Sequence, residues 1–574
     1  MFQKLIHSKA FYVFLLIFVV GFFLRAYNFE AWLHFELDQA RDATLVDEAV
    51  QDIGNLPLLG PRAAGTFARL GPWFYYLEYF FALAFGNPPV GGAVAILFFA
   101  CLSLPMFYFL FQRYFSTEKT LALTALYAAS LYFITYARFG WNPNLLPFFI
   151  LFLMYALLRA FSREKKNNGW WLLSAATAFA LLSQFHFLAL IVFGLTGLGF
   201  LLYCRPKINW KFWVGSILIV IFFYFPVIVN DIKTGGKNLD EFSRAFTKKS
   251  DDKDNHNLVE KVAKDVTENA LYYWIIISGA QTGDLPNLEI RGFPDIKCAQ
   301  YCRDHLGEGL LALLIFIAGG SLLVYKVGRQ IKIRDAKQDF LVLNLILAGT
   351  SFIIFIPLAF DLSARFFLII MPLPFLFVGI LLDLIPKRYK LIYWSLIGML
   401  ILSNLYFTQR FFIELKNTKN TAYELPRDRI LKQKTRITLE QERAIINAIE
   451  EVYNQNGYPV IYESQPEFKR ALAYLLDQKK IPRDGLSLKQ ICREANYFLI
   501  LRTQSDQNKI KEKLVTNFNF ETEQNFGTLT LTLLSLKKET ATCEQFNVKK
   551  FRNYKNEGGS SAKRYTWKEI LSKK

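Results

Sequence analysis

The chain has 574 residues, of which 53% are hydrophobic and 16% aromatic, and its formal net charge is +19. This composition is too apolar for a soluble protein of this length and predicts many membrane helices. Six cysteines exclude a disulfide scaffold. The sequence has no Gly-rich phosphate loop, zinc-ligand spacing or nucleotide fingerprint, which argues against soluble nucleotide chemistry. In such a protein, positive charge indicates basic cytoplasmic loops and attraction to anionic lipid, not nucleic acid.

The topology depends on one ambiguous segment, residues 72–86, which could cross the membrane or lie along its surface. The positive-inside rule favours the surface, because the loops between later spans then become cytoplasmic and every one of them is basic. Glu78 would then face water. The first apolar run, residues 11–24, lacks a small-residue cleavage site and is interpreted as an anchor. The sequence therefore predicts a polytopic α-helical membrane protein with a cytoplasmic N-terminus and about eleven spans. These are residues 10–27, 90–111, 119–137, 145–161, 170–185, 187–203, 212–230, 308–325, 339–358, 364–385 and 391–408.

Three large pieces face the outside in this topology, namely loops 28–89 and 231–307 and the chain from about residue 410. The last piece alternates expected helices (438–454 and 465–479) with strand-like runs (458–462 and 496–502). We therefore expect a transmembrane module over 1–410, a small extracytoplasmic α/β domain over 411–545 and a flexible basic tail over 546–574. That tail could touch anionic headgroups. Cys298 could pair with Cys302 and Cys492 with Cys543 in an oxidising exterior, although spacing alone leaves this open.

A charged run, HFELDQARD, follows the first span within the first outside loop. Asp38, Arg41 and Asp42 are three and four residues apart, so they share one face of an expected helix. A carboxylate held beside an arginine stays ionised and can accept a proton from a hydroxyl group. The alternative is a helix cap with an exposed ion pair.

Arginines in two outside regions are candidates for binding phosphate, because the planar guanidinium binds oxygens in pairs. Arg62 and Arg69 lie in the first loop, where glycines and a proline precede an aromatic run. The alternative to phosphate binding is that these arginines snorkel to the interface and that the aromatic run forms an interfacial belt. Arg365 lies between two late spans, and its alternative role is a salt bridge with Asp361.

A short outside loop at residues 135–147 contains Arg138, Trp141, Asn142 and Asn144 close to the membrane surface. Asn142-Pro143 is a turn signal, so a structural role is an equally good interpretation. His186 lies at the outer end of a span, where a lone histidine is more often a packing residue than a base.

In their order, these motifs resemble those of the GT-C superfamily of lipid-dependent glycosyltransferases, in the branch of protein O-mannosyltransferases and lipid A aminoarabinose transferases. That branch has a D-E-x-R-Y motif in the first outside loop, and Asp38, Arg41 and Asp42 fall at its first, fourth and fifth positions. Residues 70–76 resemble its K-P-P-L-Y-Y, residues 138–143 its R-x-x-x-x-D-M-P, and residues 365–372 its R-Y-x-x-x-x-x-P. The resemblance covers about residues 10–410.

The chain departs from that pattern at two acidic positions. Gln39 replaces a glutamate, and Asn142 replaces the second acidic residue. Divalent ions need several charged oxygen ligands, so this loss favours chemistry without a metal. We assign no metal site, while a divalent cation stays an open alternative. The acidic run 251–254 is better interpreted as a solvated turn than as a cation site.

The resemblance implies a glycosyltransferase that takes a sugar from a polyprenyl-phosphate donor at the outer face of the cytoplasmic membrane. Its acceptor would be protein, lipid or glycan. Asp38 would be the general base, with Arg41 and Asp42 beside it. The expected donor phosphate-binding residues are Arg69, Arg138 and Arg365, and the expected substrate-binding residues are Tyr75, Asn142 and His186. A lipid-linked polysaccharide polymerase or ligase is one alternative and a transporter or flippase another. The charges gather at one surface beside long one-sided loops, which favours chemistry over transport.

Overall fold

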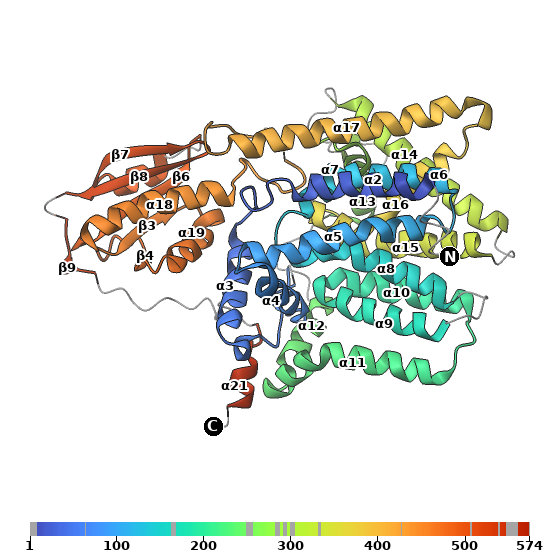
Figure 1. The fold of residues 1–574 in the computed structure, drawn as a ribbon, viewed down its shortest axis with the longest axis horizontal. Coiled ribbons are helices and arrows are strands. Elements are labelled where there is room, and N and C mark those ends of the chain that lie inside the picture. The colour runs from blue at the N-terminus through green and yellow to red at the C-terminus, as the bar shows by residue number, and fades with distance from the viewer. Residues whose placement is uncertain are drawn as a thin grey trace.

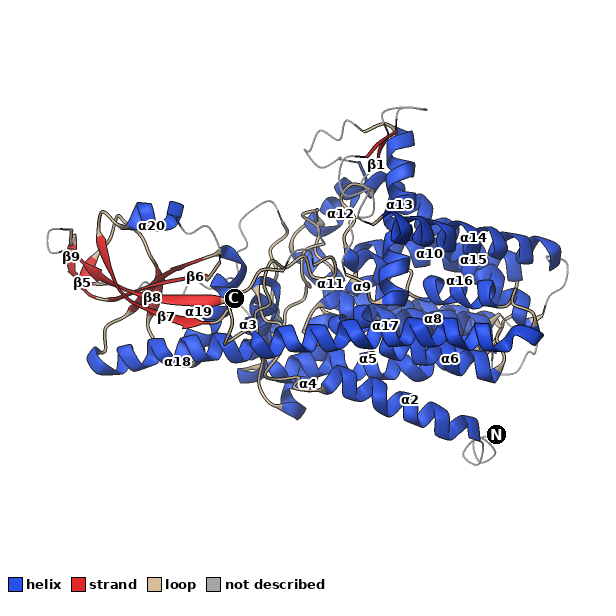
Figure 2. Cartoon of the chain, turned by 90° about the horizontal axis from the view of Figure 1, so that it is seen from above, coloured by secondary structure: helices blue, strands red, loops and turns tan. Residues whose placement is uncertain are grey.

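The protein consists of a long helical bundle followed by a domain that contains a β-sheet, as the computed structural model shows in Figures 1 and 2. The bundle helices run roughly side by side, and the sheet domain lies beyond one end of them. The N-terminal end of α2 lies at the opposite end. The structure describes residues 9–63, 65–161, 168–247, 256–281, 288–290, 296–298, 305–330, 335–425, 428–504, 508–537, 540–546 and 561–572.

All eleven expected spans are largely helical. Within the described residues, eight helices are long and apolar enough to cross a membrane. Most apolar side chains of α2 and α11 are exposed, as expected of helices whose neighbour is lipid. The helices of the bundle are α2 (Lys9–Ala26), α5 (Val90–Phe111), α6 (Thr117–Ala129), α7 (Leu131–Tyr136), α8 (Leu146–Ala160), α9 (Asn168–Phe185), α10 (Phe187–Cys204), α11 (Trp210–Lys233), α13 (Leu258–Ser278), α14 (Leu306–Gln330), α15 (Ala336–Phe355), α16 (Pro372–Leu382) and α17 (Lys390–Asn417).

The other three expected spans differ from a simple apolar helix. The segment 119–137 breaks at Ser130 into α6 and α7. Its Oγ donates to Ile276 O at 2.7 Å, and Leu131 N donates to Asn404 Oδ1 at 3.0 Å. Groups on α13 and α17 therefore replace the intrahelical bonds lost at the break. The segment 364–385 divides into the 3-10 helix η4 (Ala364–Leu368) and α16, whereas α9 is long enough but less apolar.

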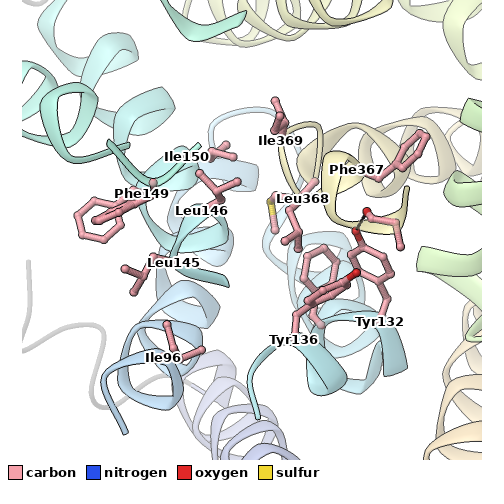
Figure 3. Packing of buried hydrophobic residues seen from close by; sticks show 14 of the residues in the cluster. Ile96, Tyr132, Tyr136, Leu145, Leu146, Phe149, Ile150, Phe367, Leu368 and Ile369 are labelled. Carbon is pink, nitrogen blue, oxygen red and sulfur yellow. Dashed lines mark hydrogen bonds between the residues drawn. The ribbon is translucent and has the colours of Figure 1, made fainter. Parts of the chain in front are cut away.

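The interior of the bundle is dominated by aromatic and branched side chains. Figure 3 shows Ile96 of α5 beside Leu145 and Phe149, and Tyr132 and Tyr136 of α7 close to Phe367. Tyr132 OH donates to Ala364 O, so the aromatic core also holds the loop before α16. This packing fixes the two segments, α7 and η4, that reach the candidate site.

The first outside loop contains two helices at one end of the bundle, α3 (Leu37–Gln51) and α4 (Trp73–Phe85), with the 3-10 helix η1 (Ile53–Asn55) after α3. The 13-residue α4 is the segment expected at the membrane surface. One expectation about it is wrong: Glu78 does not face water, because only 5% of it is exposed. Its side chain turns toward Gly92 and Gly140. A second outside piece holds α12 (Lys237–Thr247) and the short paired strands β1 (Leu288–Ile290) and β2 (Ile296–Cys298).

The C-terminal domain alternates helices and strands as the sequence predicts. Its five-stranded sheet has the order β4-β3-β6-β8-β7, with β3 parallel to β4 and β6 and the β6–β8 and β7–β8 pairs antiparallel. Its elements are α18 (Leu439–Asn456), β3 (Val460–Ser464), α19 (Pro466–Gln478), β4 (Arg483–Gly485), β5 (Cys492–Glu494), β6 (Asn496–Arg502), α20 (Asn508–Leu514), β7 (Phe518–Phe526), β8 (Leu529–Leu536) and β9 (Cys543–Gln545). The helix α21 (Trp567–Leu571) follows the domain in the chain.

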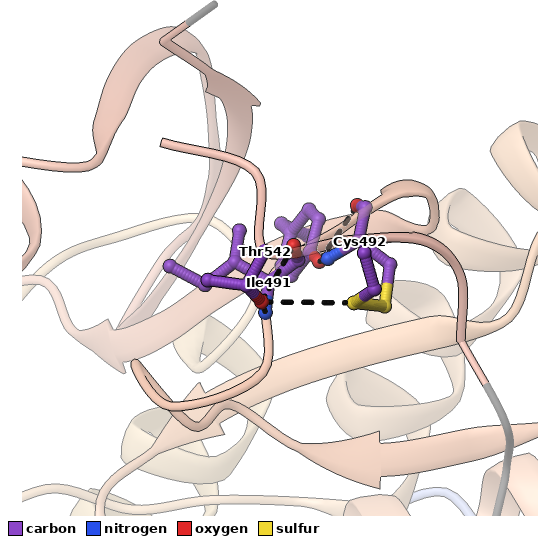
Figure 4. Close-up of a disulfide and its surroundings, with 5 residues drawn as sticks. Ile491, Cys492 and Thr542 are labelled. Atoms are coloured by element: carbon purple, nitrogen blue, oxygen red, sulfur yellow. Dashed lines mark hydrogen bonds between the residues drawn. A yellow bond between two sulfur atoms is a disulfide. The ribbon is translucent and has the colours of Figure 1, made fainter. Parts of the chain in front are cut away.

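A disulfide joins Cys492 to Cys543 and ties β5 to β9 (Figure 4). Thr542 Oγ1 accepts a hydrogen bond from Ile491 N at 2.8 Å beside it. This pairing was one of the two that the cysteine spacing left open. Cys302, the expected partner of Cys298, lies outside the described residues.

The C-terminal domain contacts the first outside loop directly. Leu439 N, at the start of α18, donates to Leu33 O at 3.0 Å. Tyr474 OH of α19 donates to Pro88 O at 3.0 Å, and Phe35 packs edge-on against the Tyr474 ring. In Figure 1 α3 stands between the sheet domain and the bundle. The domain is thus part of the wall around that loop.

Residues 561–572, which we call the strap, were expected to be flexible but instead pack on the first outside loop. Thr566 forms an antiparallel bridge with Pro57. Trp567 Nε1 donates to Tyr76 OH at 2.8 Å, and Arg564 lies over the Tyr75 ring. The expectation rested on composition, which does not reveal these distant partners.

Candidate functional site

A cavity of about 280 Å³ opens where the first outside loop meets the end of the bundle. Four segments line it: 34–39 at the start of α3, 136–141 after α7, 363–365 around η4, and 430–432 between α17 and α18. Asp38 and Arg365, both chosen from the sequence, line this one cavity. The volume is near the lower end of the ~300–1,000 Å³ typical of small-molecule sites.

Asp38 lies in the first turn of α3, which begins at the cavity. Glu36 is the N-cap residue, and its backbone N donates to Gln39 Oε1 at 3.2 Å. The positive end of the helix dipole favours a negative charge in this turn. The Asp38 side chain is 44% exposed, so an incoming hydroxyl group has access to its oxygens.

Arg41 binds both neighbouring carboxylates. Its Nη1 donates to Asp38 Oδ1 at 3.0 Å, while its Nε and Nη2 donate to the two oxygens of Asp42 at 2.8 and 3.0 Å. Asp42 is 1% exposed and accepts a further bond from Tyr75 OH at 2.9 Å. Burial alone would lower the pKa of Arg41, but Asp42, Tyr75 and Asp38 together raise it well above its ordinary value. Arg41 therefore stays charged and holds the Asp38 carboxylate in an ion pair.

Arg365 enters the cavity from η4, and no carboxylate among the described residues forms an ion pair with it. Its guanidinium lies over the rings of Trp141 and Phe366, at 5.4 and 5.3 Å from the ring centroids. Asp361 and Arg365 are both described, and no ion pair joins them, so the salt bridge considered as the alternative does not form. The Nε of Arg365 is buried without a hydrogen-bond partner among the described residues. Its position leaves the guanidinium available to an anion.

Arg138 does not reach the cavity, contrary to its expected role at the donor phosphate. Its Nη1 donates to Arg25 O at 2.9 Å and its Nη2 to Tyr27 O at 2.8 Å. Both carbonyls belong to the C-terminal end of the first span, where backbone acceptors lack intrahelical partners. Arg138 therefore caps the C-terminal end of the first span.

Arg69 is also placed away from this cavity. Its backbone forms a bridge with Arg62 and exchanges two hydrogen bonds with the Asn238 amide, at 2.8 and 3.1 Å. These contacts tie the first outside loop to α12. The structure does not bring Arg69 together with Asp38 and Arg365 in one cavity.

The three expected substrate-binding residues have structural partners instead. Tyr75 orients Asp42. Asn142 Nδ2 donates to Phe185 O at 2.6 Å. His186 caps α10 by accepting a hydrogen bond from Leu188 N, and burial lowers its pKa to about 3. None of the three lines the cavity.

Other residues that line the cavity were not selected from the sequence. Tyr136 lies on α7, and Lys432 comes from the segment between α17 and α18. Gln433, next to it, donates to Glu36 Oε1 at 2.7 Å. That segment is a short polar linker without periodicity, so no sequence pattern marks it. Within the described ranges, no three His, Cys, Asp or Glu side chains are grouped as metal ligands.

Comparisons with known proteins find solved structures with a similar fold but no family model or curated protein with a matching sequence. No family model and no curated protein matches the chain. Among solved structures, ArnT from Cupriavidus metallidurans bound to undecaprenyl phosphate is similar with a TM-score of 0.54 and 11% identity, over 93% of this chain and 99% of ArnT. The apo state of ArnT gives a TM-score of 0.53 at 10% identity, over 91% and 97% of the two chains. The archaeal oligosaccharyltransferase AglB from Archaeoglobus fulgidus is more distant, with a TM-score of 0.47 at 12% identity over 89% of this chain and 71% of AglB. The likeness to ArnT shows that this chain shares the fold of ArnT.

Proposed function

We propose that this protein is a glycosyltransferase that moves a sugar from a polyprenyl-phosphate donor to an acceptor at the outer face of the cytoplasmic membrane. The observation that carries the proposal is that Asp38 and Arg365, from segments far apart in the chain, line one cavity. The similar ArnT structure contains undecaprenyl phosphate, which supports a lipid monophosphate as the donor's carrier.

The roles of the two residues follow from their charges. Asp38 takes the proton from the acceptor hydroxyl, whose oxygen attacks the anomeric carbon of the sugar. The bond between that carbon and the phosphate oxygen breaks, and the lipid phosphate leaves with the bonding electrons. Arg365 stabilises the negative charge that develops on the phosphate. Arg41 and Asp42 hold Asp38 in place, because Arg41 bridges the two carboxylates.

The position of the cavity suits a lipid substrate. Its lining residues come from the first outside loop, η4 and the segment after α17, which meet at the end of the bundle. About 280 Å³ is enough for a sugar and its phosphate but not for a long prenyl chain. We propose that the chain lies outside the cavity along the apolar helices.

The test is transfer of a labelled sugar by the purified protein in detergent, with prenyl-monophosphate and prenyl-diphosphate sugars as parallel donors. We expect transfer from the monophosphate and a loss of roughly 10²–10³ in rate for Arg365→Gln. Arg443→Gln is the matched control, because Arg443 pairs with Glu30 outside the cavity. Consumption of the diphosphate donor alone would favour a polymerase or ligase, and no transfer from either donor would refute the proposal.

A further inference from the structure

The segment between α17 and α18 forms a rigid turn around one buried carboxylate. Asp428 Oδ1 accepts hydrogen bonds from the backbone N of Ile430 and Leu431 at 3.1 and 3.3 Å, and its Oδ2 accepts one from Gln433 N at 3.3 Å. Arg436 Nη1 lies 2.5 Å from Asp428 Oδ2. The two side chains of this ion pair are 1% and 2% exposed. Such a network fixes the path of the backbone.

Two hydrogen bonds also attach the turn to neighbouring elements that line the cavity. Tyr136 OH donates to Ile430 O at 2.8 Å, which attaches the turn to α7. Gln433 Nε2 donates to Glu36 Oε1 at 2.7 Å, which attaches it to the start of α3. Residues 430–432 therefore form one wall of the cavity and are held on both sides.

Lys432 stands at the centre of this turn in a conformation that disfavours a side chain. Its φ is +57°, in the left-handed region where glycine is the preferred residue. A lysine held there is a strained residue of the kind that clusters at functional sites. Lys432 lines the cavity, and among the described residues no acidic group is paired with it. By contrast, Lys419 is paired with Glu440.

The charges in the cavity call for a second cation. Glu36 and Asp38 both line it, so a phosphate that enters meets two carboxylates as well as Arg365. The donor phosphate is a diester with one negative charge, and breaking its bond to the sugar releases a lipid phosphate monoester, which carries nearly two negative charges at neutral pH. One guanidinium does not balance the charge of this departing phosphate, whereas a guanidinium and an ammonium do.

We propose that Lys432 is a second phosphate-binding residue of this site and, together with Arg365, binds the lipid phosphate that leaves the sugar. This inference rests on the proposed function, because it names a ligand of the same lipid phosphate. It assigns the segment after the last span, and so the junction with the C-terminal domain, a part in substrate binding.

The test separates the charge of Lys432 from the fold of the turn. A short-chain prenyl monophosphate is the probe, and its affinity is measured by equilibrium dialysis. We expect Lys432→Met and Lys432→Gly to weaken binding about ten- to hundredfold, as for loss of a charged hydrogen bond. Lys432→Gly should have a thermal midpoint equal to or above that of the wild type, because glycine adopts this φ without strain. Lys432→Arg should keep most of the affinity.

The control is Lys434→Met, which removes an exposed lysine two residues away that does not line the cavity and should leave affinity unchanged. Wild-type affinity in Lys432→Met and Lys432→Gly, together with weak binding by Arg365→Gln, would overturn the inference while leaving the proposed function in place. Loss of affinity in Lys432→Arg with a lowered thermal midpoint would assign Lys432 a structural role only. Failure of the wild-type protein to bind the probe would refute the proposed function itself.

Discussion

The two carboxylates that share Arg41 should differ in how much stability is lost when each is replaced by asparagine. Asp38→Asn breaks a half-exposed ion pair, and such pairs contribute only ~0–1 kcal/mol to the free energy of unfolding. Asp42→Asn leaves the guanidinium of Arg41, itself 10% exposed, without its buried two-point partner. Removing one member of a buried pair costs about 3–5 kcal/mol. Asparagine can still accept from Tyr75, so we expect about 3 kcal/mol.

The rate of sugar transfer should depend most strongly on Asp38, although stability depends more on Asp42. Asp38→Asn removes the proposed general base, and we expect transfer to fall by about 10²–10⁴ while the protein stays folded. Both quantities are measured on protein purified in detergent, the first by denaturant unfolding followed by tryptophan fluorescence and the second by transfer of a labelled sugar. Equal loss of stability in the two variants, or wild-type transfer by Asp38→Asn, would refute this division of roles.

Three further predictions concern regions away from Asp38. Burial raises the pKa of Glu442, whose two carboxyl oxygens have no hydrogen-bond partner among the described residues. The folded protein therefore loses stability as the pH rises above about 4.3, which is the pKa of a glutamate in the unfolded chain. Glu442→Gln should equal the wild type at pH 4 and be more stable at pH 8 in denaturant unfolding, and an advantage at pH 4 alone would contradict this sign. Replacing Cys492 and Cys543 with serine opens a loop between residues 51 apart, which should lower the unfolding free energy by about 4 kcal/mol, and an unchanged midpoint would count against the bridge. Trp567→Ala removes the hydrogen bond to Tyr76 and should speed proteolysis within the first outside loop, whereas an unchanged cleavage rate would mean that the strap does not hold that loop.

Most of the fold could be predicted because it depends on local patterns. Apolar runs marked the helices of the bundle, and the alternation of helix and strand marked the C-terminal domain. The broken span at Ser130 was not predicted, since its hydrogen bonds come from Ile276 and Asn404, which are distant in sequence. Glu78 was misplaced for a similar reason: an amphipathic pattern does not show that a loop will cover the polar face.

The candidate site was predictable only in part. The acidic cluster at Asp38 could be located because its spacing indicates one helix face. Its contacts include the ion pair and the helix start of the structural interpretation, while the catalytic interpretation stays a prediction. Arginine alone was an ambiguous signal. Arg365 and Arg138 have the same chemistry, but only the fold reveals that Arg138 lies beside unsatisfied carbonyls of the first span. The phosphate-binding and catalytic roles themselves stay predictions until transfer is measured.

The strap has a consequence for the order in which the molecule is made. Tyr76 and Trp567 are 491 residues apart, yet their side chains are hydrogen-bonded. The described helices of the bundle and the sheet domain all precede Trp567 in the chain, so they are synthesised before Tyr76 can meet its partner. Until then the loop that bears Asp38 lacks the contacts made by Arg564 and Trp567. The acidic helix of a nascent chain therefore remains without these contacts until the strap has been made.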